Sequence, residues 1–135
     1  MKKNNSMDNI NILIVEDNEG DAILVQELLE GQKEKDFKCS SVESIADSME
    51  LIKENSFDVV ILDLDLPDGK GFDTFSKIKE VAPEVPILIL SGSTMKRDEF
   101  KQCLNSADDY LVKGYLDSPS LVAAICTALD KKKTV

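Results

Sequence analysis

The chain of 135 residues contains no histidine. This absence excludes histidine metal ligands, a Ser-His-Asp triad, a Cys-His pair and a phosphohistidine carried by the chain itself. No apolar run approaches the roughly 20 residues that a transmembrane helix needs, so we expect no membrane span. Residues 1–6 carry charge but no apolar segment, which is not typical of a signal peptide.

Positive charge and cysteine are also scarce. Lysine and arginine total 16 against 26 acidic residues, a net charge of −10. This balance disfavours direct contact with nucleic acid or an anionic membrane, and it suits a metal ion, a basic partner or simply a soluble surface. Cys39, Cys103 and Cys126 are odd in number, widely spaced and set in apolar patterns. They predict reduced thiols in a cytoplasmic protein rather than disulfides or a zinc site.

Short apolar runs alternate with longer amphipathic ones. We predict strands over 10–15, 37–40, 58–63, 87–91 and 110–112, and helices over 21–30, 42–52, 72–82, 96–105 and 118–129. The first, third and fourth runs are nearly all Ile, Leu and Val, as in central strands of a parallel sheet covered on both faces. The alternation predicts one doubly wound α/β domain over 10–131 with a five-stranded parallel sheet. Residues 1–9 are expected to be a flexible leader and 132–135 a tail.

Two helix starts carry capping signals. Ser40 and Glu43 have the spacing of a capping box before the second helix. Ser118, followed by Pro119, has the pattern of an N-cap with proline at the first helical position.

Polar side chains follow the predicted strands at their carboxyl ends, where parallel α/β sheets bind ligands. They are Glu16, Asp17, Asp63, Asp65, Ser91 and Lys113. Mg²⁺ is usually held by one or two carboxylates together with water and phosphate oxygens. A lysine ammonium and a serine hydroxyl suit phosphate oxygens, and a carboxylate can act as the nucleophile that becomes an aspartyl phosphate. We therefore expect a site for Mg²⁺ and a phosphoryl group at this edge.

Asp63 and Asp65 end the most apolar run of the chain. A two-residue step along an extended strand returns to the same side, so both carboxylates are expected to point one way. Two adjacent buried negative charges are costly without compensation. Either the strand emerges at the edge of the sheet at this point or a cation lies beside the carboxylates, and we expect both.

Four motifs together resemble the receiver domain of two-component response regulators. They are ILIVEDN at 12–18, VILDLDLPDG at 60–69, ILSG at 89–92 and DYLVK at 109–113. The resemblance covers nearly the whole chain and looks like a stand-alone, chemotaxis-regulator-like receiver. It implies a flavodoxin-like (βα)₅ fold with strand order 2-1-3-4-5.

The resemblance also implies how the acidic residues act. Asp63 matches the phosphoryl acceptor, whose donor is a phosphohistidine on a sensor histidine kinase or a histidine phosphotransfer protein. Asp17 matches a direct Mg²⁺ ligand and Glu16 one that acts mainly through water. Asp63 itself and the backbone carbonyl of Asp65 match further ligands, and Mn²⁺ could substitute for Mg²⁺.

Three other residues match the parts that stabilise and report the phosphoryl group. Lys113 and Ser91 match the groups that contact it, and Ser91 with the ring of Tyr110 matches the switch. The surface expected to change comprises the fourth helix, the fifth strand and the fifth helix. The implied protein binds a downstream protein target, catalyses only its own phosphorylation and dephosphorylation, and is a monomer or a phosphorylation-dependent dimer.

The sequence departs from the family pattern at two positions. Gly114 follows the lysine where a proline, often with a cis bond, is common. A non-proline cis bond costs roughly 2.5–4 kcal/mol, so we expect a trans or strained bond and a more flexible loop. Asp65 places a carboxylate where many relatives carry a neutral side chain.

Two other functions fit parts of the pattern. A haloacid-dehalogenase-like phosphatase also places Asp-x-Asp after an apolar strand, with Asp63 as nucleophile and Asp65 as general acid. In that class the motif normally opens the chain, whereas here two strand-helix units precede it, and 135 residues leave no room for a cap domain. A pseudo-receiver that binds its partner constitutively is the other alternative, and the intact acceptor, acidic pair and lysine argue against it.

The Asp65 carboxylate generates a first prediction. It should strengthen cation binding and repel a phosphoryl group that approaches without metal, so phosphorylation of Asp63 should depend steeply on Mg²⁺. Titrating Mg²⁺ while a small phosphodonor labels the wild type and Asp65→Asn should give a shallower dependence for the variant. Identical curves would contradict this role of Asp65.

Overall fold

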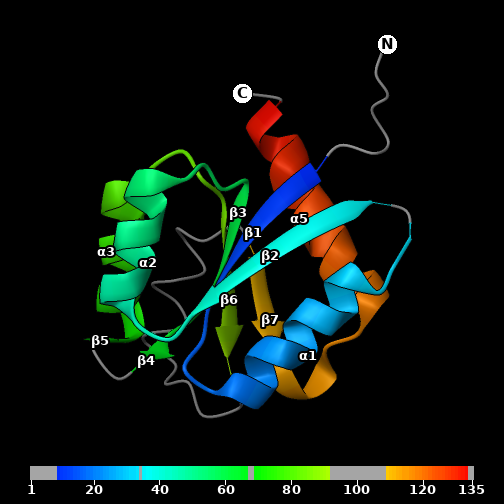
Figure 1. Ribbon diagram of the computed structural model, residues 1–135, viewed down its shortest axis with the longest axis horizontal. Coiled ribbons are helices and arrows are strands. Elements are labelled where there is room, and N and C mark those ends of the chain that lie inside the picture. Colours follow the sequence, from blue (N-terminus) through cyan, green and yellow to red (C-terminus); the bar gives the residue numbers. More distant parts are fainter. Residues whose placement is uncertain (1–8, 34, 67–68, 92–108, 134–135) are drawn as a thin grey trace.

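Five parallel strands form the central sheet of the computed structural model, which describes residues 9–33, 35–66, 69–91 and 109–133. The strands are β1 (Asn9–Val15), β2 (Asp36–Val42), β3 (Val59–Asp63), β6 (Ile87–Ser91) and β7 (Asp109–Val112). Their order across the sheet is β2-β1-β3-β6-β7 (Figure 1). Counting only these five strands along the chain, the order is 2-1-3-4-5. The predicted α/β fold and strand order are confirmed.

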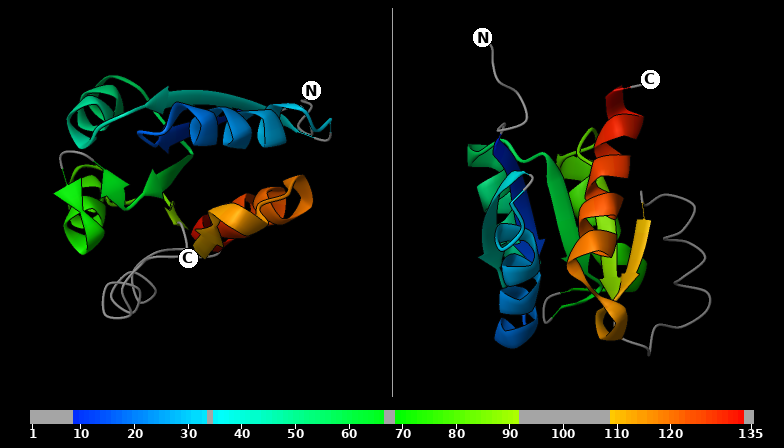
Figure 2. Two further views of the ribbon diagram at one scale, coloured as in Figure 1. Left: turned by 90° about the horizontal axis from the view of Figure 1, so that it is seen from below. Right: turned by 90° about the vertical axis from the view of Figure 1, so that its right-hand side faces the viewer.

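Helices cover both faces of the sheet. In the described part of the chain they are α1 (Glu19–Glu30), α2 (Ile45–Glu54), α3 (Gly71–Val81) and α5 (Ser118–Lys133). Figure 2 shows α1 and α5 on one side of the sheet and α2 and α3 on the other. No helix among these residues is both long enough and apolar enough to span a membrane. The predicted helix over 96–105, Cys103, residues 1–8 of the predicted leader and residues 134–135 of the predicted tail lie outside the described residues.

The central strands are apolar on both faces because each face packs on a different pair of helices. All five residues of β3 are buried. Val59 and Ile61 belong to the core cluster that includes residues of α1 and α5, whereas Val60 and Leu62 belong to the cluster with residues of α2 and α3. The side chains of β1 and β6 alternate between the same two clusters. A continuous apolar run is thus what a strand covered on both sides requires.

The N-caps of α2 and α5 are not the residues that the sequence predicted. Ser40 pairs with Leu13 in the sheet, and β2 continues to Val42, so the capping box from Ser40 to Glu43 is wrong. The N-cap of α2 is Ser44, whose Oγ accepts a hydrogen bond of 3.1 Å from the backbone N–H of Asp47. The backbone of Ser40 is paired with β1 in the sheet and therefore does not start a helix.

The start of α5 shows the same kind of shift. Asp117, not Ser118, receives the capping hydrogen bond, since its Oδ1 accepts from the backbone N–H of Ser120 at 2.8 Å. Ser118 is instead the first residue of α5, and its hydroxyl donates to the backbone oxygen of Leu28 in α1 at 2.8 Å. Ser118 therefore joins two helices that lie on the same face of the sheet.

The chain leaves the main sheet directly after Asp63. Asp65 and Leu66 form β4, which pairs antiparallel with β5 (Gly69–Lys70) in a separate two-stranded sheet. Asp63 and Asp65 therefore do not share one continuous strand. The expectation that both carboxylates point one way, which assumed such a strand, loses its basis.

The observed cap of α2 leads to a stability prediction. Replacing Ser44 with alanine should lower the free energy of unfolding by about 1 kcal/mol, because the N–H of Asp47 loses its acceptor. Ser40→Ala, on an exposed edge of β2, should change it by less than about 0.5 kcal/mol. Urea unfolding of both variants measures the difference. A larger loss of stability for Ser40→Ala would contradict Ser44 as the cap and support the capping box at Ser40.

Candidate functional site

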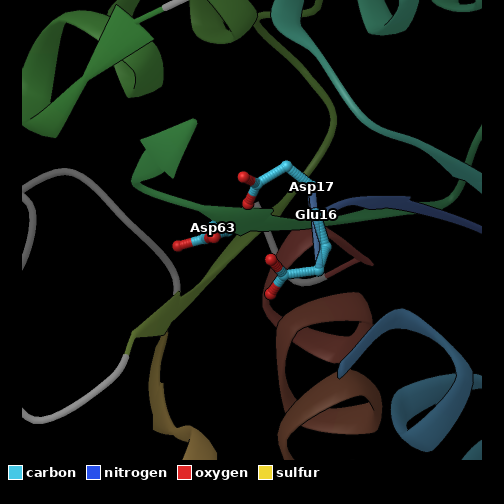
Figure 3. A group of neighbouring side chains, drawn as sticks. All are labelled: Glu16, Asp17 and Asp63. Atoms are coloured by element: carbon cyan, nitrogen blue, oxygen red, sulfur yellow. The ribbon is translucent and has the colours of Figure 1, made fainter. Parts of the chain in front are cut away.

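Three carboxylates meet at the carboxyl edge of the main sheet. Glu16 and Asp17 follow β1, and Asp63 ends β3, the strand beside it (Figure 3). Each side chain offers one oxygen, and these oxygens lie within 4.8 Å of one another. Glu16 is 1% exposed and Asp63 4% exposed, whereas Asp17 is open to solvent. The predicted acidic residues from two neighbouring strands are brought together.

Backbone hydrogen bonds fix the turn that carries this acidic pair. The N–H of Glu16 donates to the carbonyl of Val42 at the end of β2, at 2.9 Å. Glu16 Oε2 then accepts a 3.1 Å hydrogen bond from the N–H of Asn18. Asn18 is the N-cap of α1, since its Oδ1 accepts from the N–H of Asp21 at 2.9 Å. The segment after β1 therefore holds Glu16 inward while it starts the helix.

Lys113 contributes the positive charge of the site. Its Nζ lies 2.7 Å from Glu16 Oε1 and 3.5 Å from Asp63 Oδ2. Strand alternation accounts for this grouping, because Ile14, Ile61 and Leu111 all face the cluster with α1 and α5. A two-residue step from each leads to the same side. The predicted lysine thus reaches the predicted acceptor, although its nearest partner is Glu16.

Asp21 is a fourth carboxylate of the site, and the sequence reasoning missed it. Its Oδ2 lies 3.0 Å from Lys113 Nζ, closer than the oxygen of Asp63. The signal was its position in the first turn of α1, one helical turn beyond Asp17. A helix that starts at the carboxyl edge presents its first turn to that edge, so acidic residues there belong among the candidates.

The surroundings of Glu16 disfavour its charge. Burial, followed by the neighbouring Asp63, raises the pKa of Glu16 from 4.5 to about 7, although Lys113 and the N–H of Asn18 act in the opposite direction. For Lys113, burial lowers the pKa, but its contacts with Glu16 and Asp21 and the charge of Asp63 outweigh this and raise it above its usual range. The ammonium stays charged and is shared among the carboxylates.

Ser91, Tyr110 and Gly114 are the other residues singled out in the sequence that the structure places near this edge. Ser91 is buried at the end of β6, which pairs with β3 and β7. Tyr110 is partly buried on β7 and packs on the cluster with α2 and α3, the same face as Ile89. By alternation Ser91 belongs to that face too. Gly114 lies in a 3₁₀ turn over Lys113–Tyr115, where an added Cβ meets no heavy atom within 4 Å.

The donor set suits a hard divalent cation. Two of the three carboxylates are buried, and burial, followed by the neighbouring Asp63, raises the pKa of Glu16. Mg²⁺ prefers carboxylate oxygens and retains open positions for water or phosphate. Glu16, Asp17 and Asp63 therefore fit such an ion.

Comparison with known proteins shows the family to which the chain belongs. The family model of the response regulator receiver domain matches residues 12–126. The chain belongs to the family of response regulator receiver domains. Among curated relatives, the transcriptional regulatory protein PcoR of Escherichia coli is 31% identical over 123 residues, which are 91% of this chain and 53% of that protein. The transcriptional regulatory protein BasR of E. coli is 33% identical over 104 residues, 77% of this chain and 46% of the relative.

The chain thus spans about half the length of these relatives. Solved structures resemble it over almost their whole length. A response regulator receiver domain protein from Clostridium thermocellum has a TM-score of 0.79 and 27% identity, covering 93% of this chain and 98% of that one. A CheY-like receiver domain protein from Methanospirillum hungatei has a TM-score of 0.82 at 21% identity, covering 94% and 98%, which supports the fold.

The raised pKa of Glu16 generates a prediction for the metal-free protein. Between pH 4.5 and about 7 the unfolded chain releases this proton before the folded one, so this group makes stability fall as pH rises through that window. Glu16→Gln removes the effect and should stabilise the protein by on the order of 1–3 kcal/mol above pH 7. The gain should be close to zero below pH 4. Urea unfolding in a chelator across this pH range measures it, and a gain independent of pH would contradict the assignment.

Proposed function

We propose that Asp63 accepts a phosphoryl group from a phosphohistidine on a partner protein, in a Mg²⁺-dependent reaction. The observation that carries the proposal is the arrangement around Asp63. Its carboxylate is buried at the end of β3, within 4.8 Å of oxygens of Glu16 and Asp17, and 3.5 Å from the ammonium of Lys113. Membership of the receiver family supports the same chemistry.

In the proposed step an oxygen of Asp63 attacks the phosphorus in line with the bond that breaks. The new P–O bond replaces the P–N bond, whose electrons stay with the departing imidazole of the partner, and the histidine regains a proton. Charge neutralisation and in-line positioning account for most of such a transfer. Lys113 neutralises charge on the phosphoryl oxygens, and the hydroxyl of Ser91 donates to the same group.

Asp17, Asp63, the backbone carbonyl of Asp65 and, through water, Glu16 are the groups that would hold the ion. When bound, Mg²⁺ would supply positive charge that stabilises a phosphoryl group on Asp63. The chain's own contribution is to hold these groups on adjacent strands. Without a cation, the buried carboxylates repel the incoming donor.

The proposed partners are a sensor histidine kinase or histidine phosphotransfer protein and a downstream protein target. One relative, the sensor kinase/phosphatase LuxN of Vibrio harveyi, is 31% identical over 114 residues, 84% of this chain. Movement of Ser91 and the ring of Tyr110 would change the surface formed by β7, α5 and the predicted helix over 96–105. We propose a cytoplasmic regulator that is a monomer or a phosphorylation-dependent dimer and turns over no external substrate.

Removing the acceptor should abolish phosphorylation. Wild-type protein treated with acetyl phosphate and Mg²⁺ should gain one phosphoryl group, seen by intact-protein mass spectrometry, whereas Asp63→Asn should gain none because an amide is a poor nucleophile. A chelator should suppress the wild-type signal.

Asp58→Asn is the matched control. Asp58 directly precedes the same strand, where its Oδ2 accepts from the N–H of Asn11 at 2.8 Å. It should label like the wild type. Labelling of Asp63→Asn at wild-type level, or continuous release of phosphate from a generic phosphate ester, would contradict the proposal.

A further inference from the structure

Lys113 lies off-centre among the carboxylates of the site. Its Nζ is 2.7 Å from Glu16, 3.0 Å from Asp21 and 3.5 Å from Asp63. The proposed acceptor is thus the most distant of the three. The ammonium is displaced from Asp63 toward α1, the helix that carries Asp21.

The backbones of Asp21 and Lys113 are held by separate elements. The contact between these residues therefore depends on their side-chain conformations. The N–H of Asp21 is fixed by the cap Asn18, and Lys113 begins the 3₁₀ turn after β7. The side chain of Asp21 is 37% exposed, whereas the side chain of Asp63 is 6% exposed. Asp21 can therefore lose its ion pair to water at little cost, but Asp63 cannot.

A phosphoryl group on Asp63 would change this balance. It adds negative charge and several acceptor oxygens on the side from which the ammonium is displaced. An ammonium has three donors and no acceptor, and three carboxylates, Glu16, Asp21 and Asp63, already lie within 3.5 Å of it. A closer approach to the phosphoryl oxygens requires a weaker contact elsewhere, and the exposed partner is the one that gives way.

We propose that Asp21 is a positioning residue that holds Lys113 in the resting protein and competes with the phosphoryl group on Asp63 for its ammonium. This proposal rests on the proposed function of the same site. Asp21 lowers the affinity of the site for a phosphoryl group without touching that group. Its identity therefore sets how readily the domain becomes and stays phosphorylated.

The test measures binding of beryllofluoride, a mimic of the aspartyl phosphate, to the full chain in saturating Mg²⁺. Asp21→Asn should bind it about two- to fivefold more tightly than the wild type, the range expected for an ion pair near the surface. Asp21→Ser should do the same, which guards against a defect particular to one variant. Asp21→Glu, which keeps the charge and can still reach Lys113, should remain near the wild type.

Two controls separate competition for the lysine from a general charge effect. Glu19→Gln removes the same charge from the same exposed first turn of α1 and should shift the affinity by less than half as much. In a Lys113→Gln background, Asp21→Asn should have no effect beyond that of Glu19→Gln. Such a double-mutant cycle isolates the coupling between the two side chains.

The outcomes are distinguishable. An affinity of Asp21→Asn equal to or weaker than that of the wild type overturns the inference, as does a gain that persists without the lysine. If the wild type fails to bind beryllofluoride with Mg²⁺, the proposed function itself fails. Thermal melting without the mimic confirms that each variant is folded before its affinity is compared.

Discussion

The site depends on one electrostatic constraint: two carboxylates, Glu16 and Asp63, are almost completely buried at the same edge of the sheet. Such burial is costly unless a positive charge compensates it. Lys113 supplies one positive charge that Glu16, Asp21 and Asp63 share. Burial, followed by the neighbouring Asp63, raises the pKa of Glu16. Among the described residues, three carboxylates thus share one ammonium, an arrangement that suits a cation.

The fold creates this constraint through the parallel sheet. β1, β3 and β7 all end at one edge. Glu16 and Lys113 directly follow β1 and β7, Asp63 ends β3, and each lies two residues beyond a side chain of the cluster with α1 and α5, so the three come to one face. Ser91 and Tyr110 follow the opposite alternation and belong to the face covered by α2 and α3. The charge-compensating group and the proposed switch therefore lie on different sides of the sheet. Asp63 ends β3, which lies between β1, the strand before Glu16, and β6, the strand that ends in Ser91.

An apolar run sufficed to predict β1, β3 and β6 because a strand covered on both faces has little choice of residue. The same reasoning failed where pairing competes with local signals. Ser40 has the spacing of a helix cap, but its backbone pairs with β1 as part of β2. Asp65 was expected on the same strand as Asp63, but it belongs to β4 in a separate sheet. Asp21 was missed for another reason. Its ion pair joins residues 92 positions apart in the chain, and this contact depends on how α1 is placed against the end of β7.

If Asp63 accepts a phosphoryl group as proposed, the position of Lys113 links the stability of the unmodified protein to its phosphorylation. In the resting site the lysine reduces repulsion between Glu16 and Asp63, so a group that draws it toward Asp63 leaves Glu16 less compensated. If held by these carboxylates, a divalent cation would supply the positive charge that the lysine gives up. Lysine movement and cation binding should therefore favour each other, since each removes a repulsion that opposes the other. On the proposed function, this coupling follows from the sharing of one ammonium among three carboxylates of the described residues.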